Sequence, residues 1–281
     1  MAKHWAEPVT TALRADGQRI IDLDTSATPG FIGDKQRGKT LLTERGIVLS
    51  DLQEKLFAHG RTGGKHSVLL VLQGMDTAGK GGIVRHVIGS VDPQGVDHAS
   101  FGVPTEEEKQ HDFLWRIRKR LPAHGQIGVF DRSHYEDVLV VRVHELVPQS
   151  EWEQRYDLIN AFEREVADTG TTIVKVAMFV SLDEQKRRLR ERLERPDKYW
   201  KFNPADITER SFWPDYQKAY QTILERTNTD YAPWYVLPAD HKWYARLAVT
   251  ELLIDALTGL DLDWPPADFD VAEQLRRLEE S

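Results

Sequence analysis

The sequence predicts an α/β fold in which about five strands form a mainly parallel sheet with helices on both faces. Five short segments rich in Val, Ile and Leu alternate with longer amphipathic segments along the 281 residues. A glycine-rich loop follows the first apolar segment, and an aspartate ends the third. Because strands that alternate with helices form parallel sheets, both polar positions are expected at the carboxyl edge of the sheet, where ligands bind.

The composition is typical of a globular protein and excludes several functional classes. Hydrophobic residues make up 40% of the chain, and the absence of cysteine excludes disulfides, thiolate metal sites and cysteine nucleophiles. The first residues lack an apolar signal core and no apolar run reaches about 18 residues, so we expect a cytoplasmic protein that does not bind a membrane. The formal charge of −8 argues against nucleic acid as a partner, and positive charge for a polyanion would have to be local.

The N-terminal 1–48 segment is expected to form an arm, because Gly, Pro and Thr punctuate it and no regular period is sustained. Ser50 is suited to cap a short helix over 51–59 that Gly60 would end. The core is expected over 49–264. A C-terminal tail with a short helix is expected over 265–281.

Strands are expected where a short run of β-branched or aromatic residues ends in a turn or a polar residue. They cover about 67–73, 96–101, 127–130, 172–180 and 234–237. Helices are expected where apolar residues recur at spacings of three and four. They run from the glycine-rich loop to about 91, and over about 105–121, 134–145, 151–168, 183–195, 208–226 and 241–258. Thr105 and Glu108 are expected to form a capping box at the start of the second of these helices.

Residues 74–82 read Gly-Met-Asp-Thr-Ala-Gly-Lys-Gly-Gly, a loop that can surround phosphates with backbone N–H groups while Lys80 adds positive charge. The usual loop of this kind has Ser or Thr after the lysine to hold Mg²⁺, but Gly81 stands there. Asp76 is therefore the candidate metal ligand, since Mg²⁺ prefers carboxylate and phosphate oxygens. The alternative is a tight glycine turn without a ligand. The predicted phosphate-binding residues are Gly74, Thr77, Ala78, Gly79, Lys80, Gly81 and Gly82.

Asp131 ends an apolar strand and is followed by Arg-Ser-His-Tyr-Glu-Asp. An aspartate in this position is the usual second metal-holding carboxylate of P-loop enzymes, and the alternative is a helix cap. Arg132 can bind phosphate oxygens through its guanidinium group. Glu136 and Asp137 either contact an acceptor nucleotide or favour the positive N-terminus of their own helix.

Residues 183–196 form a strongly charged segment that we interpret as part of a lid at about 183–206. Arg188, Arg192 and Arg195 lie on one face of the expected helix, where a lid would position phosphates and exclude water. The alternative is a solvated surface with ion pairs four residues apart. Lys198, Lys201 and Arg210 would extend the anion track.

The loop after the second strand contains Phe101, Pro104 and Thr105. We interpret it as a wall of an acceptor pocket. The alternative is strand-end packing.

Together these motifs resemble those of the family-2 polyphosphate kinases. The resemblance covers about residues 30–260 and rests on the 74–82 loop, the 101–105 loop, the 130–137 segment, the arginine-rich lid and Tyr-Ala-Pro-Trp-Tyr-Val at 231–236. It implies a P-loop kinase-like three-layer core, similar to thymidylate kinase. It also implies reversible, Mg²⁺-dependent phosphoryl transfer between inorganic polyphosphate and nucleoside phosphates such as ADP, GDP or AMP, with Mn²⁺ as an alternative ion.

The same resemblance implies catalytic roles for Asp76, Lys80, Asp131 and Arg132, with Arg188 and Arg192 from the lid, and a metal held by Asp76 and Asp131. It also implies a homo-oligomer, either a dimer or a tetramer. The stretch 134–144 is more similar to the branch that accepts both AMP and ADP, since the ADP-preferring branch more often has Asn where Glu136 stands.

Two other functions remain open at this point. An ATP-dependent nucleoside monophosphate kinase would share the loop and the lid, but Gly81 and the number of lid arginines argue against it. A nucleotide-sensing protein without catalysis would need neither two strand-end carboxylates nor a lid.

Overall fold

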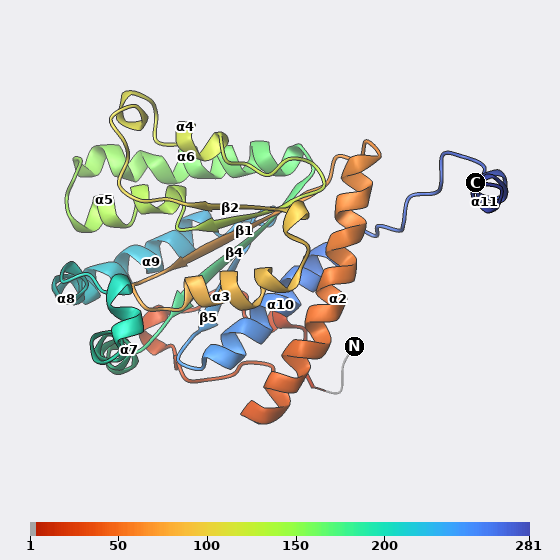
Figure 1. The fold of residues 1–281 in the computed structure, drawn as a ribbon. Helices are drawn as coiled ribbons and strands as arrows, with labels where there is room; N and C mark the ends of the chain where they lie inside the picture. The colour runs from red at the N-terminus through yellow and green to blue at the C-terminus, as the bar shows by residue number, and fades with distance from the viewer. Residues whose placement is uncertain (1–3) are drawn as a thin grey trace.

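The central sheet consists of five parallel strands in the order β2-β3-β1-β4-β5 (Figure 1). The computed structural model describes residues 4–281. The strands are β1 (Ser67–Gly74), β2 (Val96–Ser100), β3 (Ile127–Asp131), β4 (Thr171–Phe179) and β5 (Trp234–Pro238). This confirms the predicted α/β class, the five strands and their parallel arrangement.

Helices cover both faces of the sheet and form three layers with it (Figure 1). The longer helices are α2 (Lys35–Arg61), α3 (Lys80–His86), α6 (Gln149–Asp168), α7 (Leu182–Glu194), α9 (Trp213–Thr227), α10 (Lys242–Thr258) and α11 (Val271–Glu279). The shorter ones are α1 (Val9–Ala12), α4 (Trp115–Arg118), α5 (Val140–Val143) and α8 (Ala205–Glu209). None of the helices in the described part of the chain is long and apolar enough to span a membrane.

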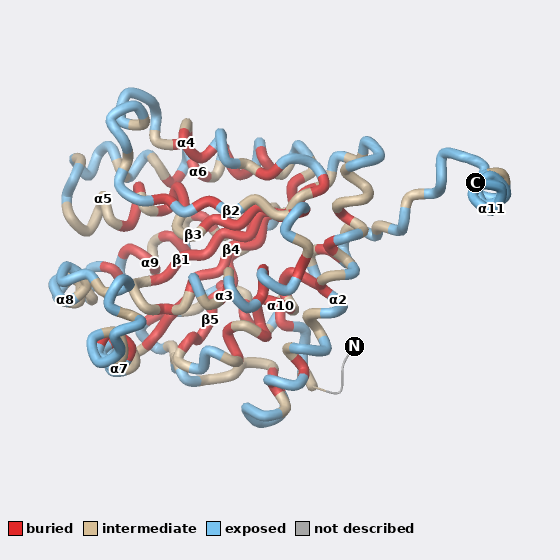
Figure 2. The backbone as a smooth tube through the Cα atoms, viewed as in Figure 1, coloured by how far each residue is buried: buried red, intermediate tan, exposed pale blue. Residues whose placement is uncertain are grey.

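Two hydrophobic clusters fill the space between the layers, one on each face of the sheet. Leu70 and Leu72 of β1 pack with α2, α3 and α10, whereas Leu69 and Val71 pack with α6 and α9. Because successive strand side chains point to opposite faces, a continuous apolar strand indicates burial on both sides. Strands β1, β3, β4 and β5 are accordingly almost entirely buried, whereas the edge strand β2 is largely intermediate or exposed (Figure 2).

The predicted helix over 51–59, capped by Ser50, is wrong in its extent. Helix α2 begins 16 residues earlier, at Lys35, and Asp34 caps it by accepting from the Arg37 backbone N–H at 2.8 Å. Gly38 and Gly46 lower the helical propensity of this stretch and hide it from a pattern-based reading. Gly38 has a packing role, because a Cβ there would lie 2.3 Å from the Trp243 ring.

Several other predicted helices are shorter or broken into 3₁₀ turns. The capping box forms, with hydrogen bonds of 2.8 and 3.2 Å between Thr105 and Glu108, but only a 3₁₀ turn (Glu108–Gln110) and α4 follow it. The predicted 134–145 helix is a 3₁₀ turn, η5 (His134–Asp137), followed by α5. The predicted 208–226 helix breaks before Trp213, where Pro214 starts α9 because proline fits the first turn of a helix.

The helix that follows the glycine-rich loop also ends earlier than expected. Regular α3 stops at His86, and a 3₁₀ turn (Ile88–Ser90) continues the chain toward β2. The predicted C-terminal helix exists as α11, which projects from the body at the end of an extended connection (Figure 1). We call residues 264–281 the C-terminal arm.

Candidate active site

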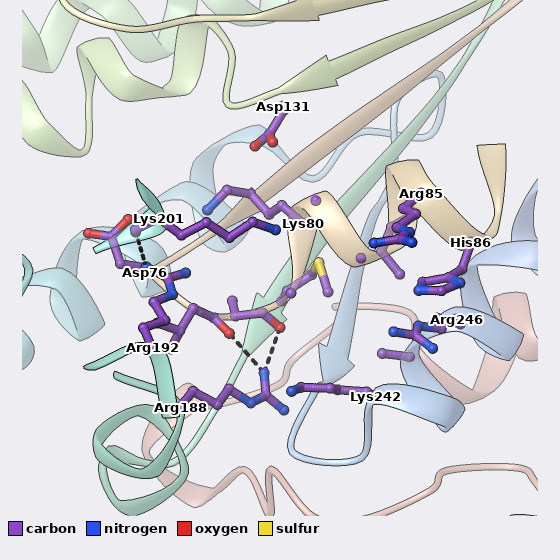
Figure 3. A pocket seen from close by; sticks show the side chains of 18 of the residues that line it. Asp76, Lys80, Arg85, His86, Asp131, Arg188, Arg192, Lys201, Lys242 and Arg246 are labelled. Carbon is purple, nitrogen blue, oxygen red and sulfur yellow. Dashed lines mark hydrogen bonds between the residues drawn. The ribbon is translucent and has the colours of Figure 1, made fainter. Parts of the chain in front are cut away.

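A cavity of about 560 Å³ opens at the edge of the sheet where β1 and β3 end (Figure 3). Its walls come from the glycine-rich loop, α3, α7, α10 and the 3₁₀ turn η6 (Pro196–Lys201). Three carboxylates line it, against ten lysine and arginine side chains. These cations are Lys80, Arg85, Arg132, Arg188, Arg192, Arg195, Lys198, Lys201, Lys242 and Arg246. The cavity therefore suits an anion of high charge.

Glycines fix the backbone of the loop at the base of this cavity. Gly79 has a φ of +117°, which L side chains rarely adopt, and a Cβ at Gly74 would lie 2.8 Å from the Met178 carbonyl oxygen on β4. Gly81 differs, because a Cβ there would meet no atom within 4 Å. Steric packing thus does not explain why glycine replaces the usual hydroxyl residue. Of the predicted phosphate-binding residues, Thr77, Ala78, Gly79, Lys80, Gly81 and Gly82 line the cavity, and Gly74 does not.

Lys80 is buried at the first position of α3 and folds back onto its own loop. Its ammonium group donates to the Gly74 carbonyl at 2.5 Å, with the Met75 carbonyl at 3.5 Å. Burial lowers the pKa of Lys80, although the Asp131 carboxylate acts in the opposite direction. The lysine therefore stands where phosphate oxygens could replace carbonyl groups as its partners.

Asp76 and Asp131 reach the cavity from two different strand ends, as the sequence predicted for a shared metal. Arg132 donates to the Asp76 carboxylate at 3.2 Å, and no described side chain donates to that of Asp131. The described residues contain no group of three or more metal-binding side chains. Two carboxylates nevertheless fit Mg²⁺, because this ion commonly binds one or two carboxylates and completes its shell with water and substrate phosphates.

Arg132 occupies a strained position directly after β3. Its φ is +63°, and its backbone N–H donates to the Leu72 carbonyl of β1 at 3.1 Å. Burial works to lower the pKa of Arg132, but Glu136, Asp76 and Asp131 outweigh it and raise the pKa. The guanidinium group stays charged and contacts Asp76, one of the two predicted metal ligands.

Arg188 lies deeper than a mobile lid arginine would. All five of its N–H groups have partners: Glu184, the Thr77 and Ala78 carbonyls of the loop, and the Ala239 and Asp240 carbonyls after β5 (Figure 3 shows the loop bonds). The side chain is 4% exposed. In this structure Arg188 holds the loop to α7 and to the turn between β5 and α10.

Arg192, one turn further along α7, is more open. It donates to the Lys201 carbonyl at 2.9 Å and to Asp206 at 3.2 Å, so it ties α7 to η6 and α8. Arg195 is half-exposed and pairs with Asp197 and Glu191. These contacts are local to the segment predicted as a lid.

The outer wall of the cavity carries cations that the sequence reading missed. Arg85 comes from α3, and Lys242 and Arg246 come from α10. No described carboxylate lies within 4.0 Å of Arg85 or Arg246, and the only one near Lys242 is Glu191 at 4.0 Å. The sequence contains one sign of this cluster. Lys242 and Arg246 are four residues apart, so they lie on the same face of their helix. We call Arg85, Lys242 and Arg246 the outer cations.

The predicted acceptor residues are divided between several places. Phe101 packs in the core against Phe130, with ring centroids 5.0 Å apart, and Thr105 forms the capping box. Phe101, Pro104 and Thr105 do not line the described cavity. Glu136 lines a second hollow of about 40 Å³ together with Arg132 and two tyrosines of α9, Tyr216 and Tyr220. Burial raises the pKa of Glu136, against the effect of Arg132 and Lys80.

Asp137 is directed into the protein. Arg155 donates to it at 3.1 Å and Arg116 lies 3.8 Å away. Burial raises the pKa of Asp137 to about 6, although both arginines act to lower it.

A buried polar network supports the segment that follows Asp131. Lys175, in the middle of β4, donates to Glu163 at 2.6 Å and to the Tyr135 hydroxyl at 2.8 Å. Glu163 also accepts from Tyr135 at 2.8 Å, and His134 lies 3.1 Å from the same oxygen. Because buried polar groups hold their geometry only when they are paired, this network fixes the turn η5 and, through it, Arg132.

Comparisons with known proteins agree with this site. Residues 33–263 match the family model described as polyphosphate kinase 2. An AMP/ADP-polyphosphate phosphotransferase of Meiothermus ruber is 48% identical over 90% of this chain and 94% of its own length. An ADP-polyphosphate phosphotransferase of Rhodopseudomonas palustris is 43% identical over 84% of each chain. The crystal structure of polyphosphate kinase 2 from Arthrobacter aurescens TC1 superposes with a TM-score of 0.97 at 53% identity, over 100% of this chain and 99% of that one.

Proposed function

The chain belongs to the polyphosphate kinase 2 family, and we propose that it transfers phosphoryl groups between inorganic polyphosphate and nucleoside phosphates. The observation that carries this proposal is the excess of ten cations over three carboxylates around a single glycine-rich loop. A nucleoside triphosphate donor carries about four charges, whereas polyphosphate carries roughly one per phosphate along its length. An extended cationic cavity favours the longer anion.

The donor is proposed to bind with its terminal phosphates on the loop. The loop N–H groups and the Lys80 ammonium would hold these phosphates, and Arg132 would neutralise charge on the group in transfer. Asp76 and Asp131 would hold the Mg²⁺ ion, or Mn²⁺ in its place, which supplies further charge neutralisation. The terminal oxygen of a nucleoside mono- or diphosphate is ionised at neutral pH, so the reaction needs no strong general base. The chain's contribution is positioning and electrostatic stabilisation.

The acceptor is proposed to approach from the side of Glu136 and Arg132. The hollow beside these residues is too small for a nucleotide as it stands, so α8 and the start of α9 would have to move outward. The names of the Meiothermus and Rhodopseudomonas relatives support AMP and ADP as acceptors. We therefore propose that both are substrates, with GDP as a further candidate.

The direct test is a transfer assay with Mg²⁺ and long-chain polyphosphate, offering AMP, ADP, GMP and GDP separately. We expect ATP from ADP, and ADP from AMP, without any nucleoside triphosphate in the starting mixture. ATP with AMP but without polyphosphate is the control for an ordinary nucleotide kinase. Transfer in that control alone would overturn the polyphosphate assignment.

The metal assignment has its own test, in which Asp131→Asn and Asp76→Asn are compared with the unaltered chain across a Mg²⁺ titration. Each substitution keeps the side-chain shape but removes a carboxylate. We expect a loss of roughly 10²-fold in turnover and a higher Mg²⁺ concentration at half-maximal rate. An unchanged Mg²⁺ dependence in both variants would contradict the proposed ligands.

A further inference from the structure

The C-terminal arm presents an apolar surface that no other described residue of its own chain covers. Val271, Leu275 and Leu278 lie at spacings of four and three, on one face of α11. They are 50%, 57% and 72% exposed, and Trp264 and Phe269 on the connection to α11 are also half-exposed. None of these five side chains belongs to either hydrophobic cluster of the described chain.

A helix of this length is not stable by itself. Isolated helices shorter than about 12–15 residues are marginal in water, and α11 has nine residues. Three pairs of side chains interact within α11, and all three are exposed. Each pair stabilises the helix by only a few tenths of a kcal/mol. Tertiary packing of the apolar face is therefore required, and the described body of the same chain does not supply it.

The projecting position is shared with the Arthrobacter relative. If the arm lay far from this position in the Arthrobacter structure, only the other 263 of the 281 residues could superpose. The TM-score could then not exceed about 0.94, the fraction of residues that superpose. The observed TM-score of 0.97 exceeds this limit, so at least part of the arm occupies the same place in both. The arm therefore projects from its own body in two chains that are 53% identical. This shared position indicates that the same kind of partner binds the arm in both proteins.

A groove at the base of the arm is suited to receive such a helix. Its volume is about 670 Å³, and Trp5, Pro8, Val9, Ile254 and Thr258 contribute its apolar lining. Two acidic residues on this groove, Glu7 and Asp255, have no ion-pair partner among the described residues. On α11, Arg276 pairs with Glu273 and Glu280. Arg277 donates to the amide oxygen of Gln274 at 3.2 Å and has no ion pair among the described residues. An apolar groove with unpaired acidic groups thus matches an apolar helix with an unpaired arginine.

We propose that the C-terminal arm docks in this groove on a second copy of the chain. The groove lies at the root of the arm, next to the end of α10, so two copies related by a two-fold axis can exchange arms reciprocally. Ten apolar side chains, five from each arm, buried at roughly 100 Å² each, give about 1,000 Å² from the arms alone. The groove surfaces that they cover add to this area, and specific interfaces bury about 1,200–2,000 Å² in total. This interaction is independent of the proposed activity.

The first experiment uses the absence of cysteine in the chain. Asp255→Cys and Arg277→Cys are prepared as separate chains, mixed, and treated with a short bismaleimide. We expect a covalent dimer of twice 32.3 kDa in the mixture and little in either variant alone. No dimer in the mixture, together with an internal cross-link when both cysteines are in one chain, would show that the arm folds back on its own body and would overturn the proposal.

The second experiment measures mass in solution by light scattering and sedimentation over a range of concentrations. Leu275→Glu places a charge in the apolar face and is expected to raise the dissociation constant at least tenfold. Ala272→Glu, beside that face on the same helix, is the matched control and should have a much smaller effect. Asp255→Arg should weaken association, and Arg277→Asp in the same chain should restore part of it. Unchanged association in both Leu275→Glu and Asp255→Arg would contradict arm exchange.

Discussion

Arg188 and Arg246 line the same cavity but use their N–H groups in opposite ways. Arg188 directs all five toward the protein, four of them to backbone carbonyls of the loop and of the turn after β5. Arg246 has no carboxylate partner among residues 4–281, and it lies close enough to the loop that a Cβ on Gly82 would be 3.7 Å from its guanidinium group. Arg188 at the inner end of the cavity therefore shapes the loop, whereas the outer cations are available to a ligand.

The sharpest test of the inner end is Lys80→Ala. We expect turnover to fall by about 10³-fold, or ~4 kcal/mol of transition-state stabilisation, because the variant loses the buried ammonium group that the loop holds against its own carbonyls. Circular dichroism should show an unchanged fold. Lys186→Ala, which removes an exposed lysine of α7 outside the cavity, should keep the unaltered rate. A Lys80→Ala enzyme with near-normal turnover would remove the loop from the mechanism.

Arg188→Met tests whether Arg188 stabilises the loop or acts on the bound ligand. The substitution keeps the length of the side chain but leaves four backbone carbonyls without this donor. We expect the free energy of unfolding to drop by ~3 kcal/mol, since breaking a buried ionic contact is strongly destabilising. Urea unfolding measures this. If stability is retained and only activity is lost, Arg188 acts on the ligand and not on the loop.

Two carboxylates also differ in whether a ligand or the protein is their partner. Asp131 lines the cavity, whereas Asp137 contacts Arg116 and Arg155 of the protein itself. The pKa of Asp137 in the folded chain, about 6, lies above the ordinary 3.8. Its protonated form is thus favoured by folding, and that stabilisation is complete below about pH 4 and is lost as the pH rises through 6. Relative to Asp137→Asn, the unaltered chain should lose at most about 3 kcal/mol of unfolding free energy between these limits. A difference that does not vary with pH would contradict the raised pKa.

Arg246→Met addresses the outer end and is expected to have the smallest effect. Stability should stay unchanged, because the guanidinium group forms no ion pair with a carboxylate in the described part of the chain. The KM for long-chain polyphosphate should rise roughly tenfold at low salt and less at high salt, since such contacts are screened. The KM for ADP serves as the internal control and should stay unchanged. Equal changes in both constants would indicate a general distortion of the site.

The sequence was sufficient where a function depends on residues close together along the chain. The loop over 74–82 and Asp131 could be placed because each directly follows an apolar strand, and parallel strands bring their carboxyl ends to one edge. Arg85 and Arg246 could not be assigned, because their meeting depends on how α10 packs beside α3. The start of α2 was missed because Gly38, which weakens the helical pattern, is required by the approach of Trp243.

The burial of Arg188 was equally invisible in the sequence. The run of arginines and glutamates is interpreted from the sequence as part of a lid, with a solvated surface as the alternative. Only the tertiary structure shows that one arginine of the run enters the space between the loop and the turn after β5. The same limit applies to Phe101, whose loop position suggested a pocket wall although its ring belongs to the core.

The bonds of Arg188 have a consequence for synthesis of the chain. The loop ends at Gly82, but the arginine that fixes its carbonyls comes about a hundred residues later, and the Ala239 and Asp240 carbonyls that fix the arginine come later still. A nascent chain that has emerged only as far as β4 already contains the loop sequence but lacks the parts that set its shape. The loop should therefore acquire its phosphate-binding form only near the end of translation, when almost the whole core has left the ribosome.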